Sequence, residues 1–374
     1  MKKNRYLIIG KLPPPYYGTS VWFEALHDSI RLKDEGVLFY DISINRSIET
    51  MSKLSLSKIL SVYRKFRGFG RFISHKKPDL VLIPLSQSFV GFLRDSFFIR
   101  KAFSLGITPL LILHGSKLLS WYKLQNFIVR RYVYSCISKA GGAIVLGDCL
   151  KYIFEPFLSS DRIYSVPNGL NLTIPTVTKN SGKLQFLYLG NLQATKGITD
   201  VIKAVSLVEP ELRSHIHLNV VGSWRDKKTM SFCYKIVSKN NLPVTFRGPL
   251  YGNEKYLMMA QCDVLVFTPR APEGHPMVII EAMAAELPII ATDQGAINES
   301  VKNGINGYLV QAEDPAAIAE KMEFFIENSM DRKRMGEESR KLYEENFTGE
   351  RMIGNLIGVF RSILKYQKGI ETIV

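Results

Sequence analysis

The chain has 374 residues, of which 46% are hydrophobic, 11% aromatic and 22% charged, and this composition excludes disordered and fibrous proteins. Its uncharged runs, such as 80–93 and 102–116, are shorter than the roughly 20 apolar residues that a helix needs to cross a bilayer, so no transmembrane span is expected. The apolar run 6–9 is too short for a signal peptide. The four cysteines share no CxxC spacing, which favours a reducing cytosolic location over a disulfide framework or a zinc cluster.

Charge is distributed unevenly along the chain. The net charge is +15; residues 1–180 hold 26 Lys and Arg against 11 Asp and Glu, whereas residues 181–374 hold 23 of each. The length allows two domains, and this asymmetry predicts a basic one and a neutral one with different partners. The basic half is expected to meet something anionic, such as an acidic lipid, a phosphorylated ligand or nucleic acid.

Apolar runs with strand character alternate with helical patterns over the whole chain, which is typical of parallel, doubly wound α/β sheets. The polar, turn-rich segment 171–182 reads as a linker, after which the pattern restarts. We therefore expect two Rossmann-like domains facing a central cleft, with ligands at the carboxyl ends of their strands. The expected strands lie near 6–9, 37–42, 80–84, 110–113, 143–146, 163–166, 184–189, 217–221, 244–246, 264–268, 289–292 and 308–310.

The segment 264–292 is the most informative part of the sequence. It reads as a buried strand, a loop rich in Pro and Gly, a helix that opens at Pro276, and a second strand. A helix N-terminus is a ready site for a phosphate. Glu273 precedes this helix and Glu281 lies within it, so each carboxylate can accept hydrogen bonds from hydroxyls of one ligand. For an isolated pair of glutamates, an ordinary solvated surface helix is the more common explanation.

The neighbouring residues favour the ligand site, because together they resemble the retaining GT-B glycosyltransferases of family four. That family carries Glu-x7-Glu followed by Ala-Met-Ala, a small turn, an apolar strand and a glycine-rich loop. The chain matches it in order with Glu273, Glu281, Ala282, Met283, Ala284, Pro288 and Gly295. Further matches run along most of the chain: 165–171, 186–190, Lys196-Gly197, 220–222, Glu299 and 303–307, with 13–20 resembling the glycine-rich loop of the N-terminal domain.

The resemblance implies roles for individual residues. Glu281 would hold the ribose of a sugar nucleotide, and Glu273 the hydroxyls of the transferred sugar. Lys196 would neutralise the diphosphate as the sugar leaves, which agrees with the absence of any Asp-x-Asp metal motif in the sequence. His114 would touch the donor sugar or orient the acceptor, without acting as a base. The residues expected near the donor are Gly18, Gly190, Asn191, Gly274, His275, Pro276 and Met277.

One position departs from the family pattern. The family usually has Arg directly after the first-strand glycine of the second domain, whereas this chain has Asn191, and a neutral amide cannot form the bidentate contact that Arg makes with phosphate. Either another cation replaces it, with Arg270 and Arg247 the nearest candidates by sequence, or the activity is reduced.

A basic, acid-free stretch between Glu49 and Asp79 carries eight cations interspersed with apolar residues at helical spacing. One interpretation is a crossover helix whose apolar stripe packs on the sheet. The other is docking on an anionic membrane through Arg64, Lys65, Arg67 and Arg71. Segments 97–103 and 121–131 form a second candidate surface, and no module for nucleic-acid binding is recognisable.

These patterns predict three segments: an acceptor and membrane-facing domain over 1–172, a donor domain over 173–350, and a final helix over 351–374 that packs back across the junction. The predicted activity is metal-independent transfer, with retention, of a hexose-type sugar from a UDP- or GDP-sugar to a lipid-linked or membrane-associated glycan in bacterial surface polysaccharide synthesis. No cofactor is expected, and the protein would lie on the inner face of the cytoplasmic membrane. The alternatives are a soluble acceptor, or a catalytically weak sugar-nucleotide-binding subunit that docks partners.

Overall fold

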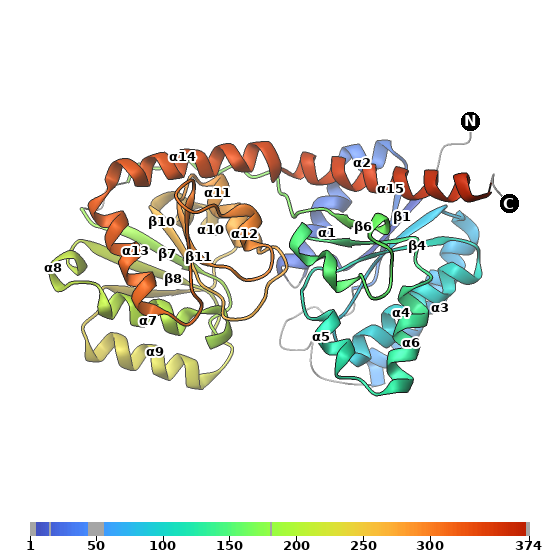
Figure 1. Cartoon of the computed structure of the whole chain (residues 1–374), viewed down its shortest axis with the longest axis horizontal. Helices are drawn as coiled ribbons and strands as arrows, with labels where there is room; N and C mark the ends of the chain where they lie inside the picture. Colours follow the sequence, from blue (N-terminus) through green and yellow to red (C-terminus); the bar gives the residue numbers. More distant parts are fainter. Residues whose placement is uncertain (1–4, 15, 44–55, 180–181, 372–374) are drawn as a thin grey trace. The chain divides into compact units, whose positions relative to one another are not determined.

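The computed structural model describes residues 5–14, 16–43, 56–179 and 182–371. The chain forms two compact units, Met1–Gly169 with Gly349–Val374, and Leu170–Thr348. Each unit is built around a six-stranded parallel sheet covered by helices (Figure 1). Every predicted strand is present, within two residues of its expected bounds, and the predicted α/β fold class is confirmed.

The first unit has the strand order β2-β1-β3-β4-β5-β6. Its strands are β1 (Tyr6–Gly10), β2 (Val37–Asp41), β3 (Leu80–Pro84), β4 (Thr108–Ile112), β5 (Gly142–Val145) and β6 (Ile163–Ser165). Strands β1, β3, β4 and β5 are almost entirely buried, because helices cover both faces of the sheet. The helices are α1 (Gly18–Asp28), α2 (Ile30–Asp34), α3 (Leu56–Lys76), α4 (Phe89–Ser104), α5 (Leu118–Lys123) and α6 (Phe127–Ile137).

The C-terminal helix α15 (Gly349–Glu371) belongs to the first unit. Its apolar residues recur at helical spacing, and Met352, Leu356 and Phe360 are buried in the core of that unit. The Phe360 ring stacks on Tyr6 of β1, with a centroid distance of 5.1 Å. The end of the chain therefore completes the domain that its beginning starts.

The second unit has the strand order β12-β11-β10-β7-β8-β9. Its strands are β7 (Leu184–Leu189), β8 (Ile216–Val221), β9 (Val244–Gly248), β10 (Val264–Phe267), β11 (Ile289–Thr292) and β12 (Gly307–Val310). Two apolar cores, one on each face, fix the helices to this sheet. The helices are α7 (Ile198–Leu207), α8 (Pro210–Arg213), α9 (Lys227–Lys239), α10 (Gly252–Gln261), α11 (Met277–Ala284), α12 (Ile297–Ser300), α13 (Pro315–Glu327) and α14 (Ser329–Asn346).

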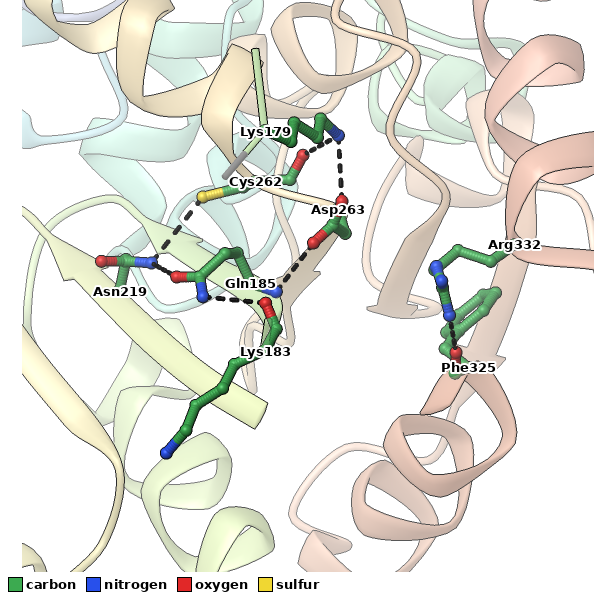
Figure 2. A network of polar contacts seen from close by, with 8 residues as sticks. All are labelled: Lys179, Lys183, Gln185, Asn219, Cys262, Asp263, Phe325 and Arg332. Carbon is green, nitrogen blue, oxygen red and sulfur yellow. Dashed lines mark hydrogen bonds and ion pairs between the residues drawn. The ribbon is translucent and has the colours of Figure 1, made fainter. Parts of the chain in front are cut away.

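The predicted linker is tied to the amino ends of β7 and β10. Nζ of Lys179 donates to the carbonyl of Cys262 at 2.6 Å and to Oδ1 of Asp263 at 3.0 Å, while the other oxygen of Asp263 accepts from the amide of Gln185 at 2.8 Å (Figure 2). This network lies at the end of the sheet where the strands begin. The loops that carry the candidate site leave the opposite end, where the strands finish.

Strand order reverses once in each sheet. In the first unit the chain passes from β2 across β1 to β3, and in the second from β9 across β7 to β10. Loops leaving two adjacent strands in opposite directions open a crevice at their carboxyl ends, which is where open α/β sheets bind ligands. The crevice positions are therefore the loops after β1 and β3, and the loops after β7 and β10.

Candidate active site

Lys196 and Glu273 meet at the reversal point of the second sheet. Lys196 ends the short helix η3 (Ala194–Lys196) that follows β7, and Glu273 lies in the loop that follows β10. The Nζ atom of Lys196 lies 2.6 Å from Oε1 of Glu273, and the two side chains are 24% and 19% exposed. The pair is partly shielded from water yet open to a ligand, so its charges act more strongly than those of a surface pair.

Two glycines bring the site loops together. Gly295 has a φ of +67°, and a Cβ there would lie 1.8 Å from the carbonyl oxygen of Glu273. Gly197 has a φ of +83°, and a Cβ there would lie 1.8 Å from the carbonyl oxygen of Thr268. Any other residue at either position would force the backbones apart. Gly295, which matches the family motif in the sequence, therefore has a physical role, because it packs against the backbone that carries Glu273.

Glu281 is buried in α11 and paired with Lys255 of α10. Nζ of Lys255 lies 2.6 Å from Oε1 of Glu281, and the side chains are 18% and 5% exposed. Burial alone would lower the pKa of Lys255, but the Glu281 carboxylate and Tyr256 outweigh it and raise that pKa. The Glu281 carboxylate is thus held in one place by a charge-assisted hydrogen bond. The sequence did not single out Lys255 for this role.

His275 and Pro276 lie at the start of α11, where the His275 side chain is buried. Nε2 of His275 lies 2.5 Å from Oγ of Ser300, and its ring packs near Phe347. Burial lowers the pKa of His275 to about 4, so the ring is neutral at physiological pH. The carbonyl of Gly274 accepts from the amide of Ala296 at 2.9 Å. Pro276 is the N-cap residue of the helix that Met277 begins.

Asn191 is contacted by an arginine that the sequence did not indicate. Nε and Nη2 of Arg225 donate to Oδ1 of Asn191 at 3.0 and 2.7 Å. The backbones of the two loops run together, since Gly190 donates to the carbonyl of Val221 and Arg225 to that of Leu192. Arg225 follows the end of β8, which neighbours β7, so sheet order brings a guanidinium to the carboxamide from 34 positions away.

Arg270 and Arg247, the replacements expected from sequence, are engaged elsewhere. Arg270 donates through Nε to Oδ2 of the buried Asp200 at 2.6 Å, and this hydrogen bond raises the pKa of Arg270. Arg247 donates through Nε and Nη2 to Oδ1 of Asn219 at 3.1 and 3.0 Å. Among the residues that the structure describes, Arg225 is therefore the cation with a direct bond to Asn191.

In the first unit, His114 follows β4 and is enclosed by aromatic rings. Its ring centroid lies 4.6 Å from that of Trp22 and 5.6 Å from that of Phe23, both on α1. Burial lowers the pKa of His114 to about 3, so its imidazole is neutral. Gly18 begins α1, and the preceding Tyr17 caps it through a backbone amide that donates to Oγ of Ser20 at 3.0 Å.

A cationic cluster occupies the reversal point of the first sheet. Asp95 of α4 is buried and accepts from the amide of Ser86, which follows β3, at 2.7 Å and from Nη2 of Arg94 at 2.6 Å. Lys11, directly after β1, lies near this group. Burial, together with the positive charge of Arg94, lowers the pKa of Lys11 to about 8 despite the opposing effect of Asp95.

The four cations expected to bind membranes lie on α3. Arg64, Arg67 and Arg71 are exposed, whereas Nζ of Lys65 donates to the carbonyl of Asp41 at 2.7 Å. The apolar stripe of α3 is largely used for packing. Phe69 and Ile73 are fully buried, and Phe66 stacks on Phe97 of α4 at 4.1 Å.

Comparison with known proteins shows a likeness to glycosyltransferases. Residues 173–342 match the family model described as glycosyl transferases group 1. An uncharacterized glycosyltransferase of Methanocaldococcus jannaschii is 27% identical over 343 residues, which cover 89% of this chain and 92% of that protein. The second unit of the chain therefore resembles this glycosyltransferase family, and the similarity to the Methanocaldococcus protein extends over most of the chain. The family match contains Lys196, Glu273 and Glu281, so both carboxylates of the motif and the lysine lie within it.

Other relatives extend the comparison. The capsular polysaccharide biosynthesis glycosyltransferase CapM of Staphylococcus aureus is 28% identical over 183 residues, covering 49% of this chain and 47% of that protein. The crystal structure of HepE from Anabaena in complex with UDP matches with a TM-score of 0.75 at 15% identity, over 96% of this chain and 100% of that one. This likeness confirms the GT-B fold.

Among the residues that the structure describes, no group of three or more His, Cys, Asp or Glu side chains is arranged to hold a metal ion. Over the same residues, no helix combines the length and the apolar character needed to span a bilayer.

Proposed function

We propose that this glycosyltransferase transfers a hexose-type sugar, with retention and without a metal ion, from a UDP- or GDP-sugar to a lipid-linked or membrane-associated glycan of a bacterial surface polysaccharide. It would work on the inner face of the cytoplasmic membrane. The observation that carries the proposal is the Lys196–Glu273 pair, 2.6 Å apart at the reversal point of the donor-type sheet, with Glu281 eight residues further on. The proposal is supported by the positions of the three side chains, because Lys196 follows β7, Glu273 follows β10 and Glu281 lies in the next helix, and open α/β sheets bind ligands where their strands end.

Charge suits these side chains to different parts of the donor. Lys196 is the group suited to the diphosphate, because charge that develops on the leaving group is stabilised best by a fixed cation that is partly shielded from water. Glu273 and Glu281 accept hydrogen bonds and so suit the hydroxyls of the sugar and the ribose. The related HepE structure was solved with UDP and also with UDP-glucose, which supports a uridine donor.

Retention without a protein base agrees with the chemistry of His114. An imidazole whose pKa is about 3 is a weak base and is enclosed by Trp22 and Phe23, so it is poorly suited to take the acceptor proton. A phosphate oxygen of the departing donor can accept that proton on the same face of the sugar. His114 would then contribute shape and a neutral polar surface.

A glycan acceptor at a membrane is supported by two observations. CapM, one of the relatives, is described as acting in capsular polysaccharide biosynthesis. The excess positive charge of this chain is confined to residues 1–180, which suits an anionic surface or a phosphorylated acceptor. A catalytically weak docking subunit is less well supported, because Arg225 places a guanidinium beside Asn191.

The proposal is tested by donor binding followed by turnover. Thermal shifts with UDP, GDP, ADP and CDP identify the base, and sugar donors of that base are then incubated with a lipid extract and with soluble glycans, with and without EDTA. We expect one uridine or guanosine donor to be consumed in EDTA and a lipid-linked product whose anomeric proton, seen by NMR, keeps the donor configuration. Inversion, or activity that only Mg²⁺ restores, would contradict the mechanism, and product on soluble glycans alone would contradict the acceptor.

A further inference from the structure

Three large apolar side chains are exposed where α5 ends and α6 begins. Figure 1 labels both helices. Leu124 is 85% exposed, Phe127 74% and Ile128 78%. They fall within five consecutive residues and so form one patch, which we call the α5–α6 tip, residues 123–131. Single exposed apolar residues are ordinary on protein surfaces, but three of this size together mark an interaction site.

The tip is held in a defined conformation. The side chain of Asn126 caps α6 by accepting from the amide of Val129 at 3.0 Å, and Nε2 of Gln125 donates to the carbonyl of Trp121 at 3.0 Å. Tyr122, just before the tip, packs edge-on against Phe157 with a centroid distance of 4.8 Å. The apolar side chains are therefore presented on a fixed turn that packs against the rest of the unit.

Charge identifies the kind of partner. The sequence contains no Asp or Glu between Asp95 and Asp148, while this interval holds seven cations: Arg100, Lys101, Lys117, Lys123, Arg130, Arg131 and Lys139. Three of them belong to the tip. Exposed apolar side chains with Lys and Arg beside them in sequence, and with no acidic residue nearby, suit the boundary between the anionic headgroups and the acyl chains of a bilayer.

We propose that the α5–α6 tip is the part of the molecule that inserts into an anionic membrane leaflet, with Leu124, Phe127 and Ile128 entering the acyl boundary and Lys123, Arg130 and Arg131 lying among the headgroups. The inference deepens the proposed function, on whose membrane acceptor it rests. It moves the contact away from α3, where Phe69 and Ile73 are already buried and Phe66 is stacked on Phe97. Cations on α3 remain available for long-range attraction only.

The test uses the full chain and vesicles of phosphatidylglycerol and phosphatidylcholine, or of phosphatidylcholine alone. The variant Leu124→Ser, Phe127→Ser, Ile128→Ser should lower the partition coefficient on anionic vesicles by about tenfold or more, since each substitution removes an apolar side chain that would enter the bilayer. The matched control is Ile30→Ser with Met330→Ser, which removes two apolar side chains that are 74% and 82% exposed elsewhere. That control should bind as the parent does.

A second variant reports insertion directly. Phe127→Trp should shift its fluorescence to shorter wavelength on anionic vesicles and be quenched by brominated lipids, whereas a surface that only touches headgroups would show neither effect. The charge reversal of Arg64, Lys65, Arg67 and Arg71 on α3 to Glu should leave this quenching in place on whatever protein remains bound. Loss of insertion in the α3 variant with none in the serine variant would overturn the assignment.

Membrane insertion by the tip can be distinguished from a protein–protein contact and from a failure of the proposed reaction. If the serine variant changes the oligomeric state of the protein but not its vesicle binding, the tip contacts protein and the inference is wrong. UDP or GDP thermal shifts should be unchanged in the serine variant, because the donor motifs lie in the other unit. A failure of the proposed reaction would appear as absent turnover in the parent while vesicle binding persists.

Discussion

The Nζ atom of Lys196 and the Oε1 atom of Glu273 lie 2.6 Å apart although 77 positions separate them in the chain. Adjacent strands β7 and β10 bring the two loops together, and the pair is charge-neutral as a unit. Under the proposed function, the Lys196 ammonium would hold the diphosphate of the sugar nucleotide and the Glu273 carboxylate the hydroxyls of its sugar. Their contact predicts that the two residues act together.

Removing Lys196 should be severe. Lys196→Ala is expected to lower kcat/KM by a factor that corresponds to about 2–4 kcal/mol of transition-state stabilisation. This is the typical effect of removing a well-placed electrostatic group. Glu273→Ala should also reduce turnover, and the double variant should lose less than the sum, because residues in direct contact are not additive. A steady-state double-mutant cycle measures this. Strict additivity would mean that the two side chains act on separate parts of the reaction.

Glu281 should act on nucleotide affinity. Ribose contacts are equal in the ground and transition states, so Glu281→Gln should weaken UDP or GDP binding, whereas Glu273→Gln should mainly lower kcat. Calorimetry with the nucleoside diphosphate compares the two, and unchanged affinity in Glu281→Gln would remove the ribose assignment.

Breaking the Glu281–Lys255 pair from either side should destabilise the second unit. Glu281→Ala leaves the mostly buried Lys255 ammonium without its partner, and an uncompensated buried charge typically costs about 3–5 kcal/mol. The combined variant Glu281→Gln, Lys255→Met should be clearly more stable than Glu281→Ala, which urea unfolding can measure. Equal stability of the two would mean that water already solvates Lys255. The combined variant also separates lost nucleotide affinity from lost folding.

Arg225 should stand in for an arginine at position 191. Arg225→Ala is expected to lower kcat/KM about tenfold or more, as loss of a charge-assisted contact to phosphate would. Adding Asn191→Arg to that variant should recover much of the activity, because it restores a guanidinium to the same edge. Arg247→Ala, which removes an arginine bonded to Asn219 instead, is the control. Loss in Arg247→Ala with none in Arg225→Ala would reverse the assignment.

Much of this fold can be predicted from the sequence, because buried parallel strands are continuous apolar runs. The runs at 80–84, 184–189 and 289–292 coincide with β3, β7 and β11, since strands covered on both faces are almost wholly apolar. The segment 264–292 was also readable, because a strand, a proline-started helix and a strand follow one another without interruption.

The partners of the site residues could not be predicted from the sequence, because they depend on strand order. Arg225 reaches Asn191 only because β8 neighbours β7, and Lys255 reaches Glu281 only because α10 packs near α11. Nothing in the spacing of Arg270 or Arg247 distinguishes them from Arg225. Likewise, the periodic stripe of α3 looked equally suited to a membrane and a core, and burial of Phe69 and Ile73 is a tertiary fact.

Lys11 should make stability depend on pH. Its pKa is lowered from 10.5 to about 8 in the folded protein, so between these values the unfolded chain binds the extra proton and the native protein does not. The free energy of unfolding therefore rises with pH in this window, by about 1–3 kcal/mol in total, and below pH 8 the half-buried ammonium of Lys11 destabilises the fold.

Lys11→Met should remove this dependence, making the protein more stable than the parent at pH 7 and bringing the two closer together by pH 9.5. The exposed Lys33→Met is the control, which should follow the parent at both values. Urea unfolding at pH 7, 8, 9 and 9.5 measures the difference. Because Lys11 lies at the reversal point of the first sheet, a position that favours ligands, the stabilised variant should also turn over more slowly. A Lys11→Met variant that is less stable at pH 7 would show that the ammonium has a partner strong enough to offset its burial.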